Sequence, residues 1–385
     1  MELAPFIADD ALAPKVRERW LAEEARRVAD AIREIGAIAQ VSKKQIQAWT
    51  RRLEGGHLTD SHVLPLPSSG VVSLPLLERL TGDAVLELAY DGPGVVLKDG
   101  SLVILPGVEE VAQHVVFDAA GGESFRHDHL RVARYSGLPA TGDAAVDEAY
   151  DGLVAASTFM SEVLGRDSIT GTDWPLVAVV HHDRGYNNAY WTGEYIVLGD
   201  GDEVIFGRFT QCPEVIASEV WPGVPEISVI TFYGETGALS ISIRDVFASL
   251  TKQYALGQTV DEADWVLGAG LVIDGVGLRS LKAPGMAYDN EVLGKDPQPD
   301  HMRDYLHTER DNGGVHINGG IPNRAFYLVA AALGGKAWER AGRIWWDALI
   351  SGEVGKTPLF ADWARLTAQA AVTRFGEDSE EHLVL

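Results

Sequence analysis

The spacing of apolar residues changes along the chain and predicts helices first, then strands, then helices again. Residues 13–53 carry apolar residues at intervals of three and four between charged residues, which is typical of an amphipathic helix. The pattern weakens near Gly36, so this stretch predicts a helical pair. Residues 55–70 are rich in glycine, serine, histidine and proline and predict a linker.

Short apolar runs bounded by glycine, proline and aspartate begin near residue 84 and predict β-strands. They include AVLELAY, GVVLKDG and SLVILPG, and strand-like segments continue to residue 133. Residues 143–164 return to helical spacing, with Asp143 as a candidate N-cap, before LVAVVHH, YWTG and YIVLGDGDEVIFG predict strands again. After Pro213 the pattern is mostly helical, and most predicted helices end at glycine. This order predicts a strand-rich lobe followed by a helical lobe, with a binding site in a cleft between them.

Composition and charge exclude several classes of protein. The 385 residues include 46% hydrophobic and 23% charged residues, which is the balance of a globular chain. The net charge of −24 argues against nucleic-acid or anionic-membrane binding, because phosphates need a basic face. The sequence contains no run of about 18 apolar residues, so we expect no membrane-spanning helix. Cys212 is the only cysteine, and acidic residues stand where a secretory leader would be basic and then apolar, so we expect a cytoplasmic protein.

Several motifs then occur in one order between about residues 114 and 377. They are GDAAVDEAY, GRDS, VHHDRGYNNAYWTG, GDGDEVIFGRFT, GETGAL, ADWVLG, LRSL and DNGGVHINGGIPNRAFYLVA. Together they resemble the thermolysin-like family of zinc metallopeptidases, in particular its short protealysin-like branch. The resemblance implies an α+β fold with a β-rich lobe over residues 108–217, an α-helical lobe over residues 218–385 and the active site between them. It does not cover residues 1–107, which we expect to form an extra N-terminal module of helices and strands. Such a module could occupy the cleft, as propeptides do in the family.

The resemblance also implies three zinc ligands, and this chain has other residues at all three positions. In the family an H-E-x-x-H helix supplies two histidines that share one helix face, and the next helix supplies a glutamate. Here the matching segment is SEVWP, with Ser218 and Pro222 at the histidine positions, and Ile241 in GALSI stands for the glutamate. Proline and isoleucine side chains have no donor atom, so we expect no metal and no cofactor. Proline should also end the helix near Trp221, because it lacks an N–H.

Calcium binding is equally unexpected. At the positions that the resemblance assigns to calcium ligands, this chain has Glu214, Lys252, Asp264, Val266 and Ala269. A lysine and two apolar residues do not make a site for a hard cation. The run GDGDE at residues 199–203 has the chemistry of a hairpin turn rather than of a calcium loop.

Other site residues of the family are kept. By resemblance, Glu219 is the general base, His316 stabilises the oxyanion and Asp311 orients that histidine. The same comparison gives the residues that would line a substrate site: Asn188, Ala189 and Tyr190 on an edge strand, Arg279 near the pocket, Phe232 in place of a tyrosine, and Ser218 and Ile241 from the altered zinc position. Asp245 matches the residue that orients the first zinc histidine. Structural explanations stay open: a solvated Glu219, a packed His316 and an Arg279 that serves in an ion pair.

Two functions follow from these residues. The first is a non-proteolytic, metal-independent enzyme in which Glu219 and His316 transfer protons in an isomerisation, elimination, addition or cyclisation of a peptide-like or small-molecule substrate. The apolar Ile241 would raise the pKa of Glu219 by desolvation. The alternative is a noncatalytic pseudopeptidase that binds a peptide or protein partner along the edge strand. We favour the enzyme, because a pure binder has less need of an acid–base pair. A hydrolase with a different metal arrangement is a third option.

Overall fold

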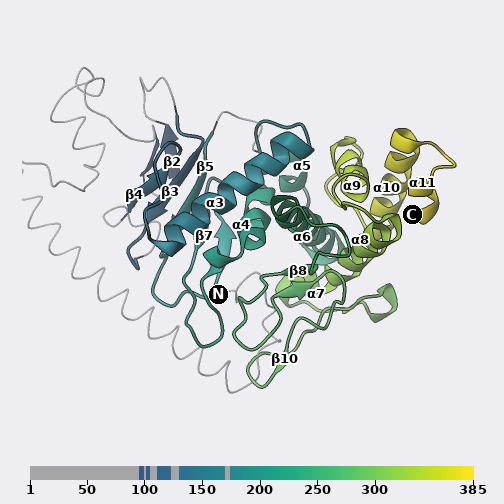
Figure 1. Ribbon diagram of the computed structural model, residues 1–385. Helices are drawn as coiled ribbons and strands as arrows, with labels where there is room; N and C mark the ends of the chain where they lie inside the picture. Colours follow the sequence, from purple (N-terminus) through teal and green to yellow (C-terminus); the bar gives the residue numbers. More distant parts are fainter. Residues whose placement is uncertain (1–94, 99–100, 105–110, 123–129, 170–173) are drawn as a thin grey trace, which may run out of the picture. The chain divides into compact units, whose positions relative to one another are not determined.

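The computed structural model describes residues 95–98, 101–104, 111–122, 130–169 and 174–385 (Figure 1). These residues belong to one compact unit of the chain, and a second unit, residues 12–72, lies outside them. The predicted helical pair, the linker and the first predicted strand also lie outside the described residues. The assignment of residues 1–107 to a separate module therefore stays a prediction.

A mixed five-stranded sheet follows a short hairpin at the start of the described chain. The hairpin pairs β1 (Val95–Lys98) with β2 (Ser101–Ile104), which confirms the two strands predicted there. The strands of the sheet are β3 (His114–Asp118), β4 (Arg131–Tyr135), β5 (Leu176–Val180), β6 (Ala189–Trp191) and β7 (Ile196–Leu198). Their order is β4-β3-β5-β7-β6; β3, β5 and β7 are parallel, and β4 and β6 run against their neighbours. Strand β6 thus lies at an edge of the sheet, as expected for the strand that contains Ala189 and Tyr190.

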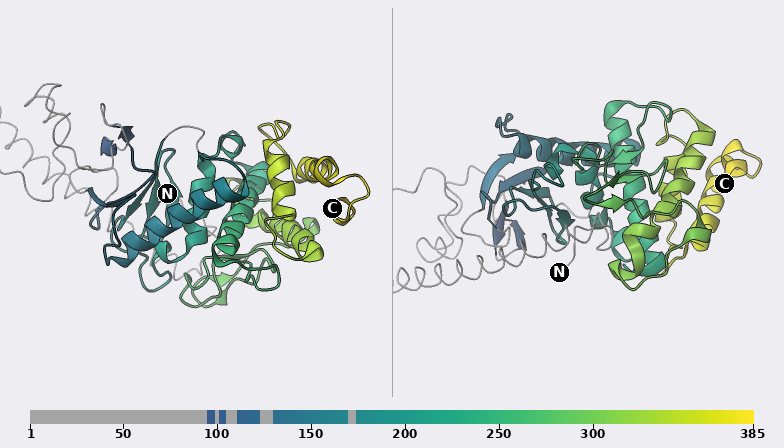
Figure 2. Two further views of the ribbon diagram at one scale, coloured as in Figure 1. Left: turned by 45° about the horizontal axis from the view of Figure 1, so that its top comes forward. Right: turned by 90° about the horizontal axis from the view of Figure 1, so that it is seen from below.

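Helix α3 (Ala144–Thr158) packs against β3, β4 and β5, and the views in Figures 1 and 2 show it lying across the sheet. The Asp143 carboxylate accepts the N–H groups of Ala145 and Val146, which confirms it as the N-cap. The helix continues into a single π turn, η4 (Phe159–Val163). Its buried face includes Leu153, which supplies apolar contact with the sheet.

Prolines divide the next helices. After the short η5 (Phe209–Gln211), helix α4 (Pro213–Val220) starts at a proline, which is favoured in the first turn because the missing N–H has no partner there anyway. It ends before Pro222, where the chain forms the 3-10 turn η6 (Trp221–Gly223) and then α5 (Pro225–Ser228). The predicted helix end near Trp221 is confirmed.

Helix α6 (Gly234–Leu256) is central to the helical part. It packs against α3, α4 and α8 and against α7 (Asp311–Asn318), and most of its residues are buried. A helix that is buried nearly all round needs no single apolar stripe, so it accepts small polar residues such as Ser240 and Ser242 among its apolar ones. It ends at Gly257, which has a left-handed φ of 63°.

Two short strand pairs, a 3-10 turn and long loops lie between α6 and α7, and the chain after α7 is mostly helical. These elements are β8 (Val266–Leu267), β9 (Arg279–Ser280), β10 (Asp289–Asn290), β11 (Gly294–Lys295), η7 (Met302–Asp304), α8 (Gly320–Leu333), α9 (Ala341–Ile350), α10 (Phe360–Phe375) and α11 (Glu380–Val384). A sheet-rich part followed by a helical part is the α+β fold predicted from the sequence. Within the described ranges, no helix combines the length and apolarity needed to cross a bilayer.

The GDGDE run forms a turn held by its own backbone. One oxygen of the Asp202 carboxylate accepts the N–H groups of Val204, Ile205 and Phe206 at 2.7–3.2 Å. Burial acts against this carboxylate, but these donors outweigh it and hold the pKa of Asp202 below its usual range. This oxygen is therefore a turn acceptor, but the predicted hairpin is not found among the described residues, because no strand directly follows the GDGDE run and Phe206 makes only an isolated bridge to Val272.

Candidate functional site

The centre of the candidate site lies where α4 packs against α6 and β6. Helix α4 supplies Ser218 and Glu219, and α6 supplies Ile241 and Arg244. Ser218, Glu219 and Ile241 are each only 2% exposed. Positions 241 and 244 lie on one face of α6, because residues three apart are neighbours on a helix. The sequence-predicted residues of this group are therefore brought together, and they are enclosed by protein.

The Glu219 carboxylate accepts four hydrogen bonds from three donor atoms. Nη2 of Arg244 donates to both of its oxygens at 3.1 Å, the backbone N–H of Trp191 donates to Oε2 at 3.1 Å, and Oγ of Ser218 donates to Oε1 at 3.4 Å. Burial raises the pKa of the Glu219 carboxyl, while the charges of Arg244, Arg279 and His316 oppose that rise. The idea of a solvated Glu219 is therefore wrong, since this carboxylate is buried in an ion pair.

Arg244 is the residue that sequence reasoning missed. Besides binding Glu219, its Nε donates to the backbone carbonyl of Ser218 at 3.2 Å, so one guanidinium fastens α6 to α4. A signal was present in the sequence, because a single arginine follows the apolar stretch GALSISI three residues after Ile241. A lone charge on the helix face that carries a position assigned by resemblance to a zinc ligand indicates a buried partner.

His316 and Asp311 form a second group on α7. Nδ1 of His316 lies 2.6 Å from Oδ1 of Asp311, and the backbone N–H of His316 donates to the other carboxylate oxygen at 2.8 Å. The segment from Asp311 to Gly314 has four successive positive φ angles of 51°, 49°, 84° and 80°. Glycine permits this left-handed turn, and the turn brings the Asp311 carboxylate beside the backbone and ring of His316, five positions later. The pairing expected between these residues is confirmed, and their role in chemistry stays a prediction.

The outer nitrogen of His316 is free for a ligand. The residue is 8% exposed, and Nε2 is buried with no hydrogen-bond partner among the described residues. The Phe232 ring lies edge-on to the imidazole, with ring centres 5.9 Å apart. Phe232 has no hydroxyl, so at this position it offers an apolar edge instead of a second donor. A buried and unpaired ring nitrogen is the clearest opening for a polar group in this region.

Arg279 has a structural partner. Its Nε and Nη2 donate to the two oxygens of Asp245 at 2.8 and 2.7 Å, and both residues are at least 98% buried. Nδ2 of Asn323 donates to the same carboxylate at 2.9 Å. Asp245, which by resemblance would orient a zinc-binding imidazole, is therefore satisfied by a bidentate guanidinium and an amide. Of the two explanations of Arg279, the structure favours the ion pair.

Strand β6 places its edge beside Glu219. Asn188 precedes the strand and accepts the N–H of Ala189 with its own side-chain oxygen at 2.8 Å. Ala189 is buried, and the Tyr190 ring packs edge-on against the His182 ring at 6.2 Å. The N–H of Trp191, next along the edge, already binds Glu219. The three predicted edge residues are thus adjacent to the site, and part of the edge is used internally.

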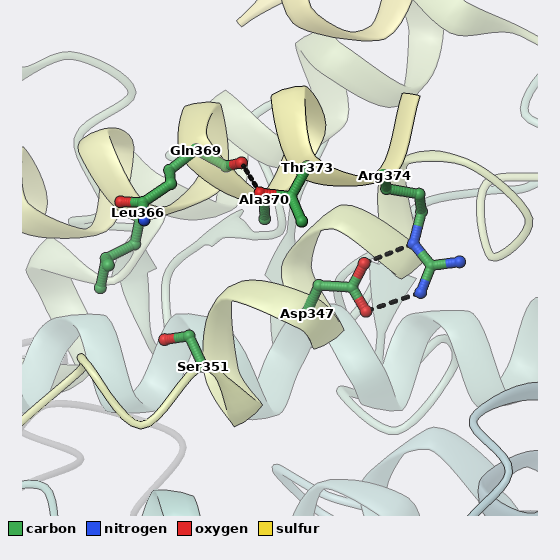
Figure 3. A pocket seen from close by; sticks show the side chains of 7 residues that line it. All are labelled: Asp347, Ser351, Leu366, Gln369, Ala370, Thr373 and Arg374. Atoms are coloured by element: carbon green, nitrogen blue, oxygen red, sulfur yellow. Dashed lines mark hydrogen bonds and ion pairs between the residues drawn. The ribbon is translucent and has the colours of Figure 1, made fainter. Parts of the chain in front are cut away.

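A cavity of about 500 Å³ lies elsewhere, between α9 and α10 (Figure 3). Its lining consists of Asp347, Ser351, Leu366, Gln369, Ala370, Thr373 and Arg374. Arg374 binds Asp347 through two donors, as the close-up shows, so its charges are already paired. None of the residues around Glu219 or His316 lines this cavity. Within the described part of the chain, no three histidine, cysteine, aspartate or glutamate side chains are grouped to hold a metal ion.

Comparisons with known proteins agree with the fold. The profile "Thermolysin metallopeptidase, catalytic domain" matches residues 118–226, and "Thermolysin metallopeptidase, alpha-helical domain" matches residues 228–384. The chain is 48% identical over 249 residues to "Extracellular metalloprotease" of Pectobacterium carotovorum subsp. carotovorum, covering 64% of this chain and 72% of the relative. It is 46% identical over 256 residues to "Protease PrtS" of Photorhabdus sp. (strain Az29), covering 65% and 69%. The solved structure "Precursor of Protealysin, Metalloproteinase from Serratia proteamaculans" superimposes with a TM-score of 0.67 at 43% identity, covering 73% of this chain and 88% of that chain.

The names of these relatives correct several predictions. Relatives named as metalloproteases contradict a non-proteolytic, metal-independent lyase, isomerase or cyclase, and equally its alternative, a noncatalytic pseudopeptidase. The name "Extracellular metalloprotease" contradicts the cytoplasmic location. The physical reason is that three altered positions and one acid–base pair do not specify a reaction. Likewise, a low cysteine content removes disulfides without fixing a compartment.

Proposed function

Because this chain belongs to the thermolysin family of metallopeptidases, we propose that it acts on peptides or proteins at the site formed by Glu219, Arg244 and His316. The names of its relatives favour peptide-bond hydrolysis as the reaction, and one of them favours a secreted protein. Proteolysis takes the place of the proton-transfer reactions predicted from the sequence.

The observation that carries this proposal is the unpaired Nε2 of His316. Asp311 accepts from Nδ1 and fixes the ring, so Nε2 lies on the opposite side and has no hydrogen-bond partner among the described residues. A neutral ring held in this way offers Nε2 as an acceptor, and a protonated ring offers an N–H to a carbonyl oxygen. A peptide carbonyl beside His316 would therefore satisfy a buried group that is otherwise left without a partner.

The edge of the sheet supports a peptide rather than a compact ligand. Among the described strands, β6 lies at the edge of its sheet, and an extended peptide can add to such an edge through backbone hydrogen bonds. Trp191 already donates to Glu219 and Ala189 donates to the side chain of Asn188, so a peptide that adds to this edge would replace one of these internal hydrogen bonds. This places the peptide next to the Glu219 ion pair.

The zinc ion implied by the family needs a separate proposal. The residues at its expected position do not fit it, since Pro222 and Ile241 offer no donor and the Ser218 hydroxyl is directed to Glu219. Arg244 also brings a positive charge to the carboxylate that would face the metal, and two cations this close repel. We propose that this chain is a member of the family that lacks the three zinc ligands at these positions.

The experiment uses the full chain and measures substrate and metal separately. Unfolded casein is incubated with the protein, and its products are identified by mass spectrometry; binding of labelled casein fragments is followed by fluorescence anisotropy. Both assays are run with added zinc and with a chelator. Zinc content after dialysis is measured by mass spectrometry of the metal.

His316→Ala tests the substrate site, and His307→Ala, an exposed histidine that contacts Tyr305, is the matched control. We expect binding and any hydrolysis to fall about tenfold or more in His316→Ala and to stay unchanged in His307→Ala. Wild-type protein that neither binds nor cleaves casein fragments contradicts the peptide substrate. The proposal that the chain lacks the zinc ligands is contradicted if the wild type keeps one zinc ion per chain after dialysis and Glu219→Gln does not.

A further inference from the structure

A buried lysine joins three segments of the chain at some distance along α6 from the Glu219 site. Lys252 is 8% exposed, and its Nζ lies 3.2 Å from Oε1 of Glu214 on α4, 2.9 and 3.2 Å from the two oxygens of Asp264, and 3.2 Å from the carbonyl of Val266 on β8. An ammonium has three N–H donors, and here three groups accept from it. Its hydrogen-bonding capacity is therefore used completely.

Glu214 depends on this charge. The residue is 1% exposed, and Oε1 also accepts the N–H groups of Gly268 and Ala269 at 3.0 and 3.3 Å. A carboxylate removed from water in this way needs a compensating cation as well as hydrogen bonds. Lys252 is the cation that the structure supplies to it.

These contacts coincide with the positions that sequence resemblance assigns to calcium ligands. Glu214, Asp264 and Val266 surround Nζ of Lys252, and Ala269 binds Glu214 through its N–H. The oxygens that would face a calcium ion thus face an ammonium. Calcium takes six to eight oxygen ligands, whereas this group offers two carboxylates and one carbonyl around a positive side chain. The residues do not fit calcium.

We propose that Lys252 is a covalently tethered cation that takes the place of calcium, so that the packing of α4, α6 and β8 at this point is independent of calcium. The charges support this assignment. Two carboxylates and one ammonium leave a net charge of about −1, and the remaining charge falls on Asp264, whose side chain is 47% exposed and is hydrated. The buried member, Glu214, receives the compensation.

The ammonium is charged when it acts in this way. Burial works against the charged form, but Glu214 and Asp264 outweigh it and hold the pKa of Lys252 above its usual value. The lysine is thus a cation that is covalently part of the chain. Folding at this point therefore requires no metal ion from solution and no loss of entropy from binding one.

The test measures thermal unfolding of the full chain by circular dichroism in calcium and in a calcium chelator. We expect wild-type Tm to be the same in both. Lys252→Glu places a third carboxylate beside Glu214 and Asp264, so its Tm should fall by several degrees in chelator and recover in millimolar calcium. Lys356→Glu makes the same charge change at an exposed lysine and should show neither effect.

Lys252→Met keeps the proposal falsifiable if Lys252→Glu does not fold. It leaves Glu214 buried without a cation, so Tm should fall in both buffers, and calcium should restore less than it restores in Lys252→Glu. The proposal is overturned if calcium raises the Tm of the wild type as much as that of Lys252→Glu, or if Lys252→Met melts at the wild-type temperature. Neither result bears on the peptide substrate, which rests on different residues.

Discussion

Nη2 of Arg244 donates to both carboxylate oxygens of Glu219 at 3.1 Å, across 25 residues of sequence. The pair lies where the resemblance to thermolysin-like enzymes would place a metal and its catalytic carboxylate. A second basic side chain, Lys252, lies at the position assigned to calcium. In both places a charge carried by the chain faces a buried glutamate. Helix α6 carries both basic residues, two turns apart, and α4 carries both glutamates.

Removing the guanidinium should destabilise the protein strongly. Arg244→Met leaves Glu219 buried without its cation, and breaking such a pair costs about 3–5 kcal/mol. Urea unfolding measures the loss, and the double variant with Glu219→Gln should regain part of it because no buried charge is left. Arg303→Met is the matched control, since Arg303 is 73% exposed in its pair with Asp304 and should change stability by less than about 1 kcal/mol. A loss below that level in Arg244→Met would show that Glu219 does not need its partner.

Asp311→Asn should impair His316 without unfolding the chain. The amide can still approach Nδ1, but it does not stabilise a protonated imidazole as a carboxylate does. We expect peptide binding or hydrolysis to fall about tenfold or more, with a changed pH profile and a Tm close to that of the wild type. Asp304→Asn, on an exposed carboxylate, is the control. An unchanged pH profile together with lower Tm would assign Asp311 a structural role only.

The stability of the protein should depend on His181 at alkaline pH. Nδ1 of His181 lies 2.8 Å from Asp200 and Nε2 lies 3.2 Å from Asp143, and the hydrogen bond and charge of Asp200 outweigh burial and raise the pKa of His181 to about 9. Because the folded pKa is above the unfolded value of about 6.5, this contribution is complete below pH 6.5 and is lost as pH rises through 9.

His181→Asn tests this, since asparagine tolerates the positive φ of 53° at this position. Unfolding free energies of the two proteins should differ by about 1–2 kcal/mol at pH 6, and the difference should shrink towards zero by pH 10. A difference that stays constant from pH 6 to 10 would mean that the histidine contributes by packing and not by its charge.

Gly314 should be far less tolerant than another glycine with the same backbone conformation. Gly314 and Gly352 have φ angles of 80° and 78°. Alanine at either position would be strained by about 1–2 kcal/mol, because residues with a Cβ disfavour the left-handed region. A Cβ at Gly314 would also lie 2.9 Å from Nδ2 of Asn318 and 3.1 Å from Thr308, whereas a Cβ at Gly352 meets open space. Gly314→Ala should therefore lose more stability in urea unfolding than Gly352→Ala. Equal losses would show that the turn before His316 has room to adjust.

Local features of the sequence determined a large part of this protein. Alternating and helical apolar spacing gives the sheet-rich part and the helical part, Pro222 ends α4, and Asp143 caps α3, because each effect acts within a few residues. The pairing of Asp311 with His316 was implied by the family resemblance, and the left-handed turn over residues 311–314 brings the two residues together. Function and location were predicted from altered ligand positions and composition, and comparison with relatives corrected both.

Only the tertiary structure decided which charges meet. Arg244 with Glu219, Arg279 with Asp245 and Lys252 with Glu214 are separated by 25, 34 and 38 residues. Periodicity predicts that a residue lies on a buried face, but the partner across that face depends on how α4, α6 and the short strands β8 and β9 pack together. Electrostatic pairing in a protein interior is a property of distance and burial, and neither is present in the chain until those helices are in contact.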